Sequence, residues 1–222
     1  MIKTIIFDMD GVLFDTEKIY DEAWKIILKE KNIKDIEYII SGCRGLTVED
    51  SERFIDEKLN GEFSGKECLK ELLLKYNEII ELRGVPLKKG VCELLSYLKE
   101  NNYEIGLASS THKDMVIHHL KNANIFEYFS EVITGDMVEK GKPEPDIYLL
   151  ACSKLNKKPE ECIAVEDSIC GVTAAIKAGM KTIMVPDTVK PTDNIKEQLY
   201  NKSDSLLEVK EFLKGNENSI KN

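Results

Sequence analysis

The sequence predicts an α/β fold: a doubly wound, Rossmann-like parallel sheet with an inserted all-helical cap domain. Three observations predict it. Short apolar segments rich in β-forming residues recur along the chain, most are followed by a segment with helical periodicity, and one long region shows helical periodicity alone. Alternating strands and helices are typical of parallel βαβ units, which bind ligands at the carboxyl ends of their strands.

The predicted strands are short, and each ends at turn residues or at a helical pattern. They are residues 2–7 (IKTIIF), 103–109 (YEIGLAS), 131–135 (EVITG), 162–166 (CIAVE) and 181–185 (KTIMV). Helices with one apolar face are predicted within residues 90–102, 145–156 and 168–179. In the last of these, Gly179 is expected to close the helix as its C-cap.

Helical signals alone fill the region from about Glu17 to Gly84. They cover residues 17–32, 48–60 and 64–82. The last segment opens with Ser64 and has Glu67 three residues later, which is a capping box. A crossover of three helices without a strand would be unusually long. We therefore expect a core of residues 1–15 and 85–222 and a helical cap of residues 16–84.

Composition limits the classes of partner. Hydrophobic residues make up 42% and charged residues 32% of the 222 residues, as in ordinary globular proteins. With 40 acidic against 31 basic residues, the net charge of −9 argues against a nucleic-acid surface. The apolar runs are too short to span a bilayer, and no signal-peptide pattern opens the chain. The six cysteines lie among apolar neighbours and do not have metal-binding spacing. We expect a cytoplasmic monomer without membrane or nucleic-acid partners.

Acidic residues follow two of the predicted strands. Asp8 and Asp10 follow the first strand, and their carboxylates should converge because residues two apart on an extended chain face the same way. Close carboxylates repel, and a bound Mg²⁺ would remove that penalty. A capping Asp followed by an Asp-Gly turn would also explain this motif alone. Glu166 and Asp167 end a second strand, and two such pairs are hard to explain by folding alone.

Two further segments fit an anion site. Ser109, Ser110 and Thr111 end a predicted strand just before a helix, where hydroxyls and backbone N–H groups can hold a phosphate or simply cap the helix. Lys140 and Lys142 lie in a Gly/Pro-containing loop and both qualify as phosphate partners by position. His112 and Lys113 begin the helix after the serines and are candidate substrate contacts.

Taken together, four motifs resemble those of the haloacid dehalogenase superfamily, and most closely its phosphatases and phosphoglucomutases with a helical cap. The motifs are DMDGVLFDT (8–16), ASST (108–111), KGKPEPDIY (140–148) and VEDSICG (165–171). The resemblance implies that Asp8 is a nucleophile forming an aspartyl-phosphate, and that Asp10 is first the general acid and then the base for water. The dehalogenase branch itself uses no such second acid and no metal.

The resemblance also implies a metal site and a phosphate site. Mg²⁺ would be held by Asp8, Asp167 and the backbone carbonyl of Asp10, and Glu166 would support it directly or through water. Ser109 and Lys142 would hold the phosphoryl oxygens. The full set of candidate substrate or phosphate contacts is Ser109, Ser110, Lys142, Thr16, Arg44, His112 and Lys113.

Departures from the β-phosphoglucomutase pattern favour hydrolysis. Those mutases usually carry a His where this chain has Tyr20, and an Arg in the cap loop where Val48 aligns; Arg44 lies nearby but not at that position. The sequence Asp-Thr-Glu at residues 15–17 is typical of the phosphatases. We expect an Mg²⁺-dependent phosphatase of a small phosphorylated metabolite, possibly a sugar phosphate. A phosphomutase is the alternative, and a catalytically silent binding protein is a third hypothesis that the retained acids oppose.

Overall fold

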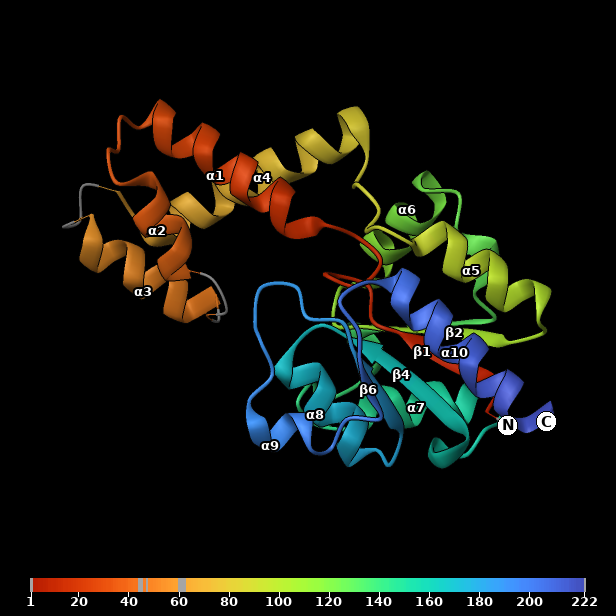
Figure 1. Cartoon of the computed structure of the whole chain (residues 1–222). Helices are drawn as coiled ribbons and strands as arrows, with labels where there is room; N and C mark the ends of the chain where they lie inside the picture. Colours follow the sequence, from red (N-terminus) through yellow and green to blue (C-terminus); the bar gives the residue numbers. More distant parts are fainter. Residues whose placement is uncertain (1, 44–45, 47, 60–62, 222) are drawn as a thin grey trace. The chain divides into compact units, whose positions relative to one another are not determined.

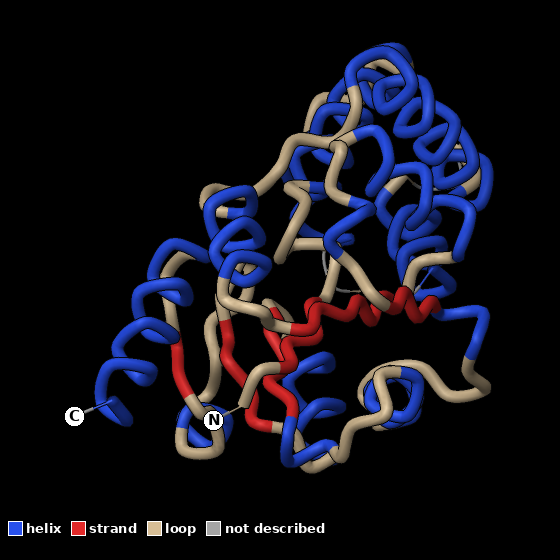
Figure 2. The backbone as a smooth tube through the Cα atoms, turned by 90° about the vertical axis from the view of Figure 1, so that its right-hand side faces the viewer, coloured by secondary structure: helices blue, strands red, loops and turns tan. Residues whose placement is uncertain are grey.

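The computed structural model describes residues 2–43, 46, 48–59 and 63–221 (Figure 1). The chain forms two compact units. One consists of Met1–Asp15 and Pro86–Asn222, and the other is Thr16–Val85. The first unit is the α/β unit and the second is all-helical in its described residues, where Figure 2 shows helices joined by loops.

The α/β unit is built on one parallel sheet of six described strands, in the order β3-β2-β1-β4-β5-β6. The strands are β1 (Thr4–Phe7), β2 (Glu104–Ser109), β3 (Glu131–Thr134), β4 (Cys162–Glu166), β5 (Lys181–Met184) and β6 (Asn201–Lys202). β1 lies inside the sheet, where Phe7 pairs with Leu107 of β2 on one side and with Val165 of β4 on the other. All four residues of β1 are buried, as is usual for an inner strand of a parallel sheet.

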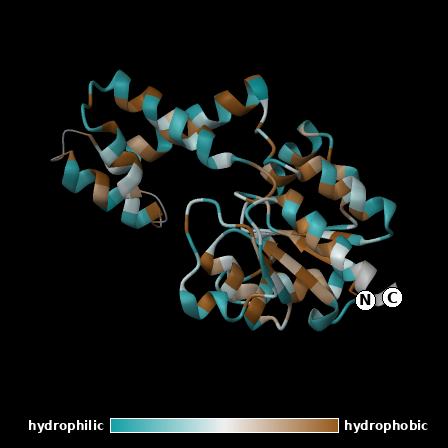
Figure 3. Cartoon of the chain, viewed as in Figure 1, coloured by the Kyte–Doolittle hydropathy of each residue, from teal (hydrophilic) through white to brown (hydrophobic). Residues whose placement is uncertain are grey.

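Helices cover both faces of this sheet. They are α5 (Val91–Glu100), α6 (Lys113–Asn122), α7 (Asp146–Lys154), α8 (Ile169–Lys177), α9 (Asp193–Lys196) and α10 (Leu206–Lys221). α5 packs against α10, whereas α7 packs against α8, β2 and β3 (Figure 1). One buried cluster between the sheet and the helices includes Ile6, Ala108, Tyr148 and Ala164. In Figure 3 the strands are drawn largely in the brown of hydrophobic residues.

The predicted α/β fold class is confirmed, with differences at element ends. The two-residue strand β6 was not predicted, because so short an edge strand carries no apolar pattern. The C-cap of α8 is Ala178 rather than Gly179. Gly179 follows the cap with φ of 88°, so it occupies the left-handed position just beyond the helix end where glycine is favoured.

The helical unit contains four helices in its described part. They are α1 (Thr16–Glu30), α2 (Ile36–Cys43), α3 (Val48–Lys58) and α4 (Gly65–Arg83). α4 packs against both α1 and α3. Its N-cap is the predicted one, since Ser64 Oγ accepts a hydrogen bond from the Glu67 N–H at 3.4 Å. α2 was missed because its eight residues are too few for a clear helical period.

None of the described helices is long and apolar enough to cross a membrane. The six cysteines are free; Cys68, Cys152 and Cys162 are buried, whereas Cys92 and Cys170 are exposed. Cys43 is partly buried, so three of the six cysteines lie in the core.

Candidate active site

The ends of β1 and β4 bring the main acidic residues together. Asp8 directly follows β1, and its backbone N–H donates to the Val165 carbonyl of β4 at 2.9 Å. Glu166 is the last residue of β4, and Asp167 follows it. The chain builds β1, β2 and β3 outward on one side and then returns to place β4 on the other side of β1. Such a reversal of strand order is where doubly wound sheets bind ligands.

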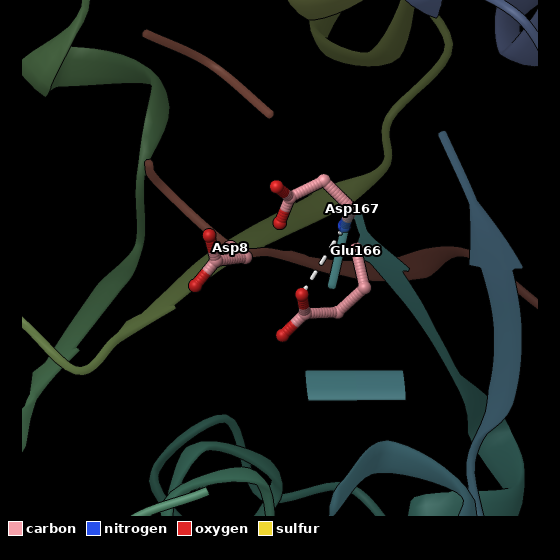
Figure 4. Close-up of side chains that lie close together, drawn as sticks. All are labelled: Asp8, Glu166 and Asp167. Atoms are coloured by element: carbon pink, nitrogen blue, oxygen red, sulfur yellow. Dashed lines mark hydrogen bonds between the residues drawn. The ribbon is translucent and has the colours of Figure 1, made fainter. Parts of the chain in front are cut away.

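Three carboxylates meet at this edge. Asp8, Glu166 and Asp167 each offer an oxygen, and these oxygens all lie within 4.8 Å of one another (Figure 4). Asp8 is 7% exposed and Glu166 is fully buried. Carboxylates held this close out of water repel strongly unless a cation lies among them.

Lys142 supplies one positive charge to the group. Its Nζ donates to Asp8 Oδ1 at 2.5 Å, to Glu166 Oε1 at 2.7 Å and to the Ala108 carbonyl at 3.0 Å. Burial by itself lowers the pKa of Lys142, but the Asp8 and Glu166 carboxylates outweigh it and raise that pKa above its usual range. Lys142 is therefore a permanent ammonium that bridges the two strand ends.

One lysine does not neutralise three acids. Burial, followed by the charges of Glu166 and Asp167, raises the pKa of Asp8, while Lys142 opposes the rise. Burial and the Glu166 charge raise the pKa of Asp167 to about 7. With all groups ionised, three carboxylates and one ammonium sum to a formal charge of −2. The site has the charge and the hard oxygen donors that suit a divalent cation such as Mg²⁺.

Glu166 is held by four donors. Oε1 accepts from the Tyr148 hydroxyl at 2.6 Å as well as from Lys142, and Oε2 accepts from the Asp167 N–H at 3.2 Å and from Ser168 Oγ at 3.4 Å. A carboxylate has about four lone-pair positions, so these partners occupy the usual number. These hydrogen bonds hold the Glu166 carboxylate in place and leave few of its lone pairs for a ligand.

Two glycines make room for the acids. A Cβ on Gly171, in the first turn of α8, would lie 1.9 Å from Glu166 Oε1. A Cβ on Gly11 would lie 2.2 Å from Asp167 Oδ2, and Gly11 has a φ of 81°. Only glycine combines that φ with the missing side chain, so the Asp10–Gly11 turn lets the Asp167 carboxylate approach.

Asp10 has a hydrogen-bond partner of its own. Its carboxylate is not part of the group formed by Asp8, Glu166 and Asp167. β1 ends at Phe7 and a turn begins at Gly11, so the strand does not continue through Asp10. Asp10 Oδ2 accepts a hydrogen bond from Thr111 Oγ1 at 2.7 Å. Asp10 remains close enough for its charge to contribute to the raised pKa of Asp8.

The predicted anion segment lies beside this site. Ser109 is fully buried at the end of β2, and its Oγ accepts from the Thr111 N–H at 3.1 Å. Ser110 is exposed. His112 and Lys113 are also exposed and lie next to Asp136, to which the Lys113 N–H donates at 3.0 Å.

The remaining candidates are one lysine of the α/β unit and two residues of the sequence region 16–85. Lys140 is exposed and makes no described ion pair with the acids, so Lys142 is the lysine of the site. Thr16 is buried as the first residue of α1 in the helical unit. Arg44 lies outside the described residues.

Sequence reasoning missed three residues that shape the site. Tyr148 fits the apolar face of its helix, so nothing in the pattern indicates that its hydroxyl reaches Glu166. Thr111 was considered only for an anion site. Gly171 carried a usable signal, because glycine is unfavourable in a helix unless space requires it.

Fold and site together define a Rossmann-like α/β protein with a lysine-bridged carboxylate site at the carboxyl ends of β1 and β4. The model of the family described as haloacid dehalogenase-like hydrolase matches residues 5–185, and the chain belongs to this family.

Similar proteins include enzymes of two kinds. The chain is 36% identical to a "Probable pseudouridine-5'-phosphatase" of Drosophila melanogaster over 82% of this chain and 80% of that one. It is 33% identical to a beta-phosphoglucomutase of Bacillus subtilis over 83% of both chains. A solved structure from Thermotoga maritima, 28% identical, matches with a TM-score of 0.84 over 96% of this chain and 99% of that chain. The relatives thus include a phosphatase and a phosphomutase.

Proposed function

We propose that this protein is an Mg²⁺-dependent phosphatase that acts on a small phosphorylated metabolite through an aspartyl-phosphate on Asp8. One observation carries the proposal: the Asp8 carboxylate lies at a strand end with Lys142 Nζ at 2.5 Å and with Asp167 in the same group of acids. A carboxylate so placed can attack phosphorus beside fixed positive charge, which is what phosphoryl transfer requires.

The donor set fits Mg²⁺. The metal would be held by the Asp8 and Asp167 carboxylates and the backbone carbonyl of Asp10. Its support is the excess of three carboxylates over one ammonium in a buried site, where burial and then the neighbouring acids raise the pKa values of Asp8 and Asp167. When bound, Mg²⁺ would neutralise negative charge on the phosphoryl group and on the nucleophile. Glu166, with its four protein donors, would act by holding Lys142 rather than by direct coordination.

The reaction would proceed in two displacements. Asp8 attacks the phosphorus, an Asp8 oxygen–phosphorus bond forms, and the ester bond breaks as Asp10 gives its proton to the leaving oxygen. Water then attacks the phosphorus and passes a proton to Asp10, so that inorganic phosphate and the free Asp8 carboxylate are released. Lys142 and Ser109 would hold the phosphoryl oxygens, and Ser110, His112 and Lys113 would lie at the substrate side of this site.

The two units would have different roles in the reaction. We infer that the α/β unit, residues 1–15 and 86–222, is catalytic and that the helical unit is a cap that contributes substrate contacts. Thr16 and Arg44 are the cap candidates from the sequence. Tyr20 and Val48 line a pocket inside the helical unit, at the two positions where the mutases carry His and Arg. Their uncharged side chains support hydrolysis, since a mutase must grip a bisphosphate intermediate.

The first experiment is a screen of phosphorylated metabolites for release of inorganic phosphate. We expect activity that requires Mg²⁺ and is abolished by EDTA and by Asp8→Asn. Full Mg²⁺-dependent activity of Asp8→Asn would contradict the covalent mechanism. Absence of turnover with every phosphate monoester, including an activated aryl phosphate, would favour the silent binding protein instead.

A phosphomutase is the second candidate, and the 33% identical beta-phosphoglucomutase supports it. Incubation with β-glucose 1-phosphate and a catalytic amount of β-glucose 1,6-bisphosphate separates the two. The proposed phosphatase releases inorganic phosphate without accumulating glucose 6-phosphate. Accumulation of glucose 6-phosphate with little free phosphate would establish the mutase.

A further inference from the structure

An ion pair outside the group of acids joins two loops of the α/β unit. Lys88 Nζ donates to Asp187 Oδ1 at 2.6 Å, although the two residues are 99 positions apart in the chain. Their side chains are 22% and 19% exposed, so the pair is largely shielded from water. Charges that are partly buried act on their neighbours with less screening than charges on the surface.

Asp187 lies near the acids at the carboxyl ends of the strands. β5 pairs with β4, and the Val185 N–H just beyond β5 donates to the Glu166 carbonyl at 2.7 Å. Asp187 follows Val185 by two residues, on the loop that leaves this edge of the sheet. Burial and then the Glu166 charge raise the pKa of Asp167, and the Asp187 charge adds to the rise. The Asp187 carboxylate therefore adds negative potential at Asp167.

Lys88 is held in place by backbone hydrogen bonds. Its N–H donates to the Leu13 carbonyl at 2.9 Å, and the Asp15 N–H donates to the Pro86 carbonyl at 2.9 Å. The segment that carries Lys88 is thus bonded to the segment that follows β1. Both partners of the ion pair are therefore attached to loops at the carboxyl ends of strands.

One oxygen of Asp187 has no donor. Within the part of the chain that the structure describes, Asp187 Oδ2 is buried and accepts no hydrogen bond. A buried carboxylate oxygen without a donor costs free energy, so such an atom in a folded protein calls for an explanation. A metal site nearby supplies one, because a negative charge outside the coordination shell stabilises a bound cation.

We propose that the Lys88–Asp187 ion pair sets the affinity of the site for Mg²⁺: the Asp187 carboxylate strengthens binding from outside the coordination shell, and the Lys88 ammonium limits it. The inference rests on the proposed function, because it assumes that Asp8 and Asp167 hold Mg²⁺. The two charges act in opposite directions, so removal of one should shift the affinity and removal of both should largely cancel.

Variants that remove one charge at a time test this inference. The full-length protein is titrated with Mg²⁺ alone in an isothermal titration calorimeter. Asp187→Asn keeps an acceptor for Lys88 and should raise the Kd for Mg²⁺ about five-fold. Lys88→Gln keeps a donor for Asp187 and should lower that Kd about five-fold. The double variant should stay within about two-fold of wild type.

A second ion pair of the same unit is the matched control. Lys157 Nζ lies 3.2 Å from Glu104 Oε2, and Glu104 is the first residue of β2, so this pair is at the opposite end of the strands. Lys157→Gln and Glu104→Gln remove the same charges there and should leave the Kd for Mg²⁺ within about two-fold of wild type. Urea denaturation followed by circular dichroism gives the stability of each variant. A merely structural role would lower stability without moving the Kd values of Asp187→Asn and Lys88→Gln in opposite directions.

Two results would overturn the inference: unchanged Kd values in Asp187→Asn and Lys88→Gln, or a shift of both in the same direction. If Asp187→Asn does not fold, Lys88→Gln must still bind Mg²⁺ more tightly than wild type, and failure to do so overturns the inference equally.

The two proposals fail in different ways. If wild-type protein hydrolyses an aryl phosphate with Mg²⁺ and both variants bind Mg²⁺ as wild type does, the role of the ion pair is wrong and the phosphatase proposal stands. If wild-type protein neither binds Mg²⁺ nor releases phosphate from any monoester, the phosphatase proposal and the inference that rests on it both fall.

Discussion

The Thr111 hydroxyl donates a 2.7 Å hydrogen bond to Asp10 Oδ2, and the Asp10 carboxylate is not part of the group formed by Asp8, Glu166 and Asp167. Two acids two residues apart thereby acquire different surroundings. Asp8 is buried against an ammonium, and Asp10 is bonded to a neutral hydroxyl. The two acids that the proposed reaction uses as nucleophile and as proton donor therefore have different hydrogen-bond partners.

Thr111 should therefore matter for leaving groups that need a proton. In Thr111→Val we expect kcat for an alkyl phosphate to fall about ten-fold, because Asp10 loses the bond that orients it. For p-nitrophenyl phosphate, whose leaving group departs without protonation, the fall should stay below about three-fold. Thr111→Ser keeps the hydroxyl and should restore most of the activity. An equal loss with both substrates would refute the positioning role.

Replacing Gly171 with alanine should destabilise the protein, whereas the same replacement at an ordinary helical glycine stabilises it. Gly171→Ala places a Cβ 1.9 Å from Glu166 Oε1, so we expect a loss of about 1–3 kcal/mol in the free energy of unfolding and a large loss of activity. Gly215→Ala, within α10, meets nothing within 4 Å and should stabilise by up to about 1 kcal/mol. Urea denaturation followed by circular dichroism measures both, and stabilisation by Gly171→Ala would show that the site tolerates a shifted Glu166.

Tyr148 should stabilise the protein mainly through Glu166. Tyr148→Phe removes a 2.6 Å hydrogen bond to a buried carboxylate, so we expect a loss of about 1.5–3 kcal/mol in the free energy of unfolding. In a Glu166→Gln background the same change should cost less, because the bond to a charged acceptor is already gone. A double-mutant cycle gives this coupling. Additive effects would mean that Tyr148 acts through packing alone.

His119 should make stability depend on pH. It is 3% exposed, with its ring 5.8 Å from that of Phe14, and burial followed by the charge of His118 lowers its pKa to about 4. Between about pH 6.5 and pH 4, His119 is protonated in the unfolded chain but neutral in the folded protein. The free energy of unfolding therefore decreases as the pH is lowered through this range, by up to about 3 kcal/mol.

A substitution isolates this effect. His119→Leu should remove that part of the pH dependence, so the variant gains stability relative to wild type as the pH falls from 6.5 to 4. His118→Gln, on the same helix but partly exposed, is the control and should keep most of it. Parallel stability curves for wild type and His119→Leu would show that His119 binds its proton equally well in the folded and unfolded states, and would contradict the prediction.

Sequence patterns predicted the parts of the fold that depend on hydrophobic period and on the alternation of strands and helices. The strands that carry Asp8 and Glu166 are apolar runs ending in acids, and parallel pairing brings such ends together. The geometry of Asp10 could not be predicted in this way, because it depends on where β1 stops extending. The hydrogen bonds from Thr111 to Asp10 and from Tyr148 to Glu166 join segments that are distant in the sequence. A single sequence does not indicate which distant side chains meet.

The central claim is that Asp8 carries the phosphoryl group, and acid quenching tests it most directly. Wild-type protein with Mg²⁺ is mixed with p-nitrophenyl phosphate labelled at phosphorus, quenched in acid within the first turnover and digested. We predict label on the peptide that contains Asp8, lost on treatment with hydroxylamine and absent from Asp8→Asn. Rapid phosphate release by wild type without protein-bound label, together with full activity in Asp8→Asn, would contradict the account.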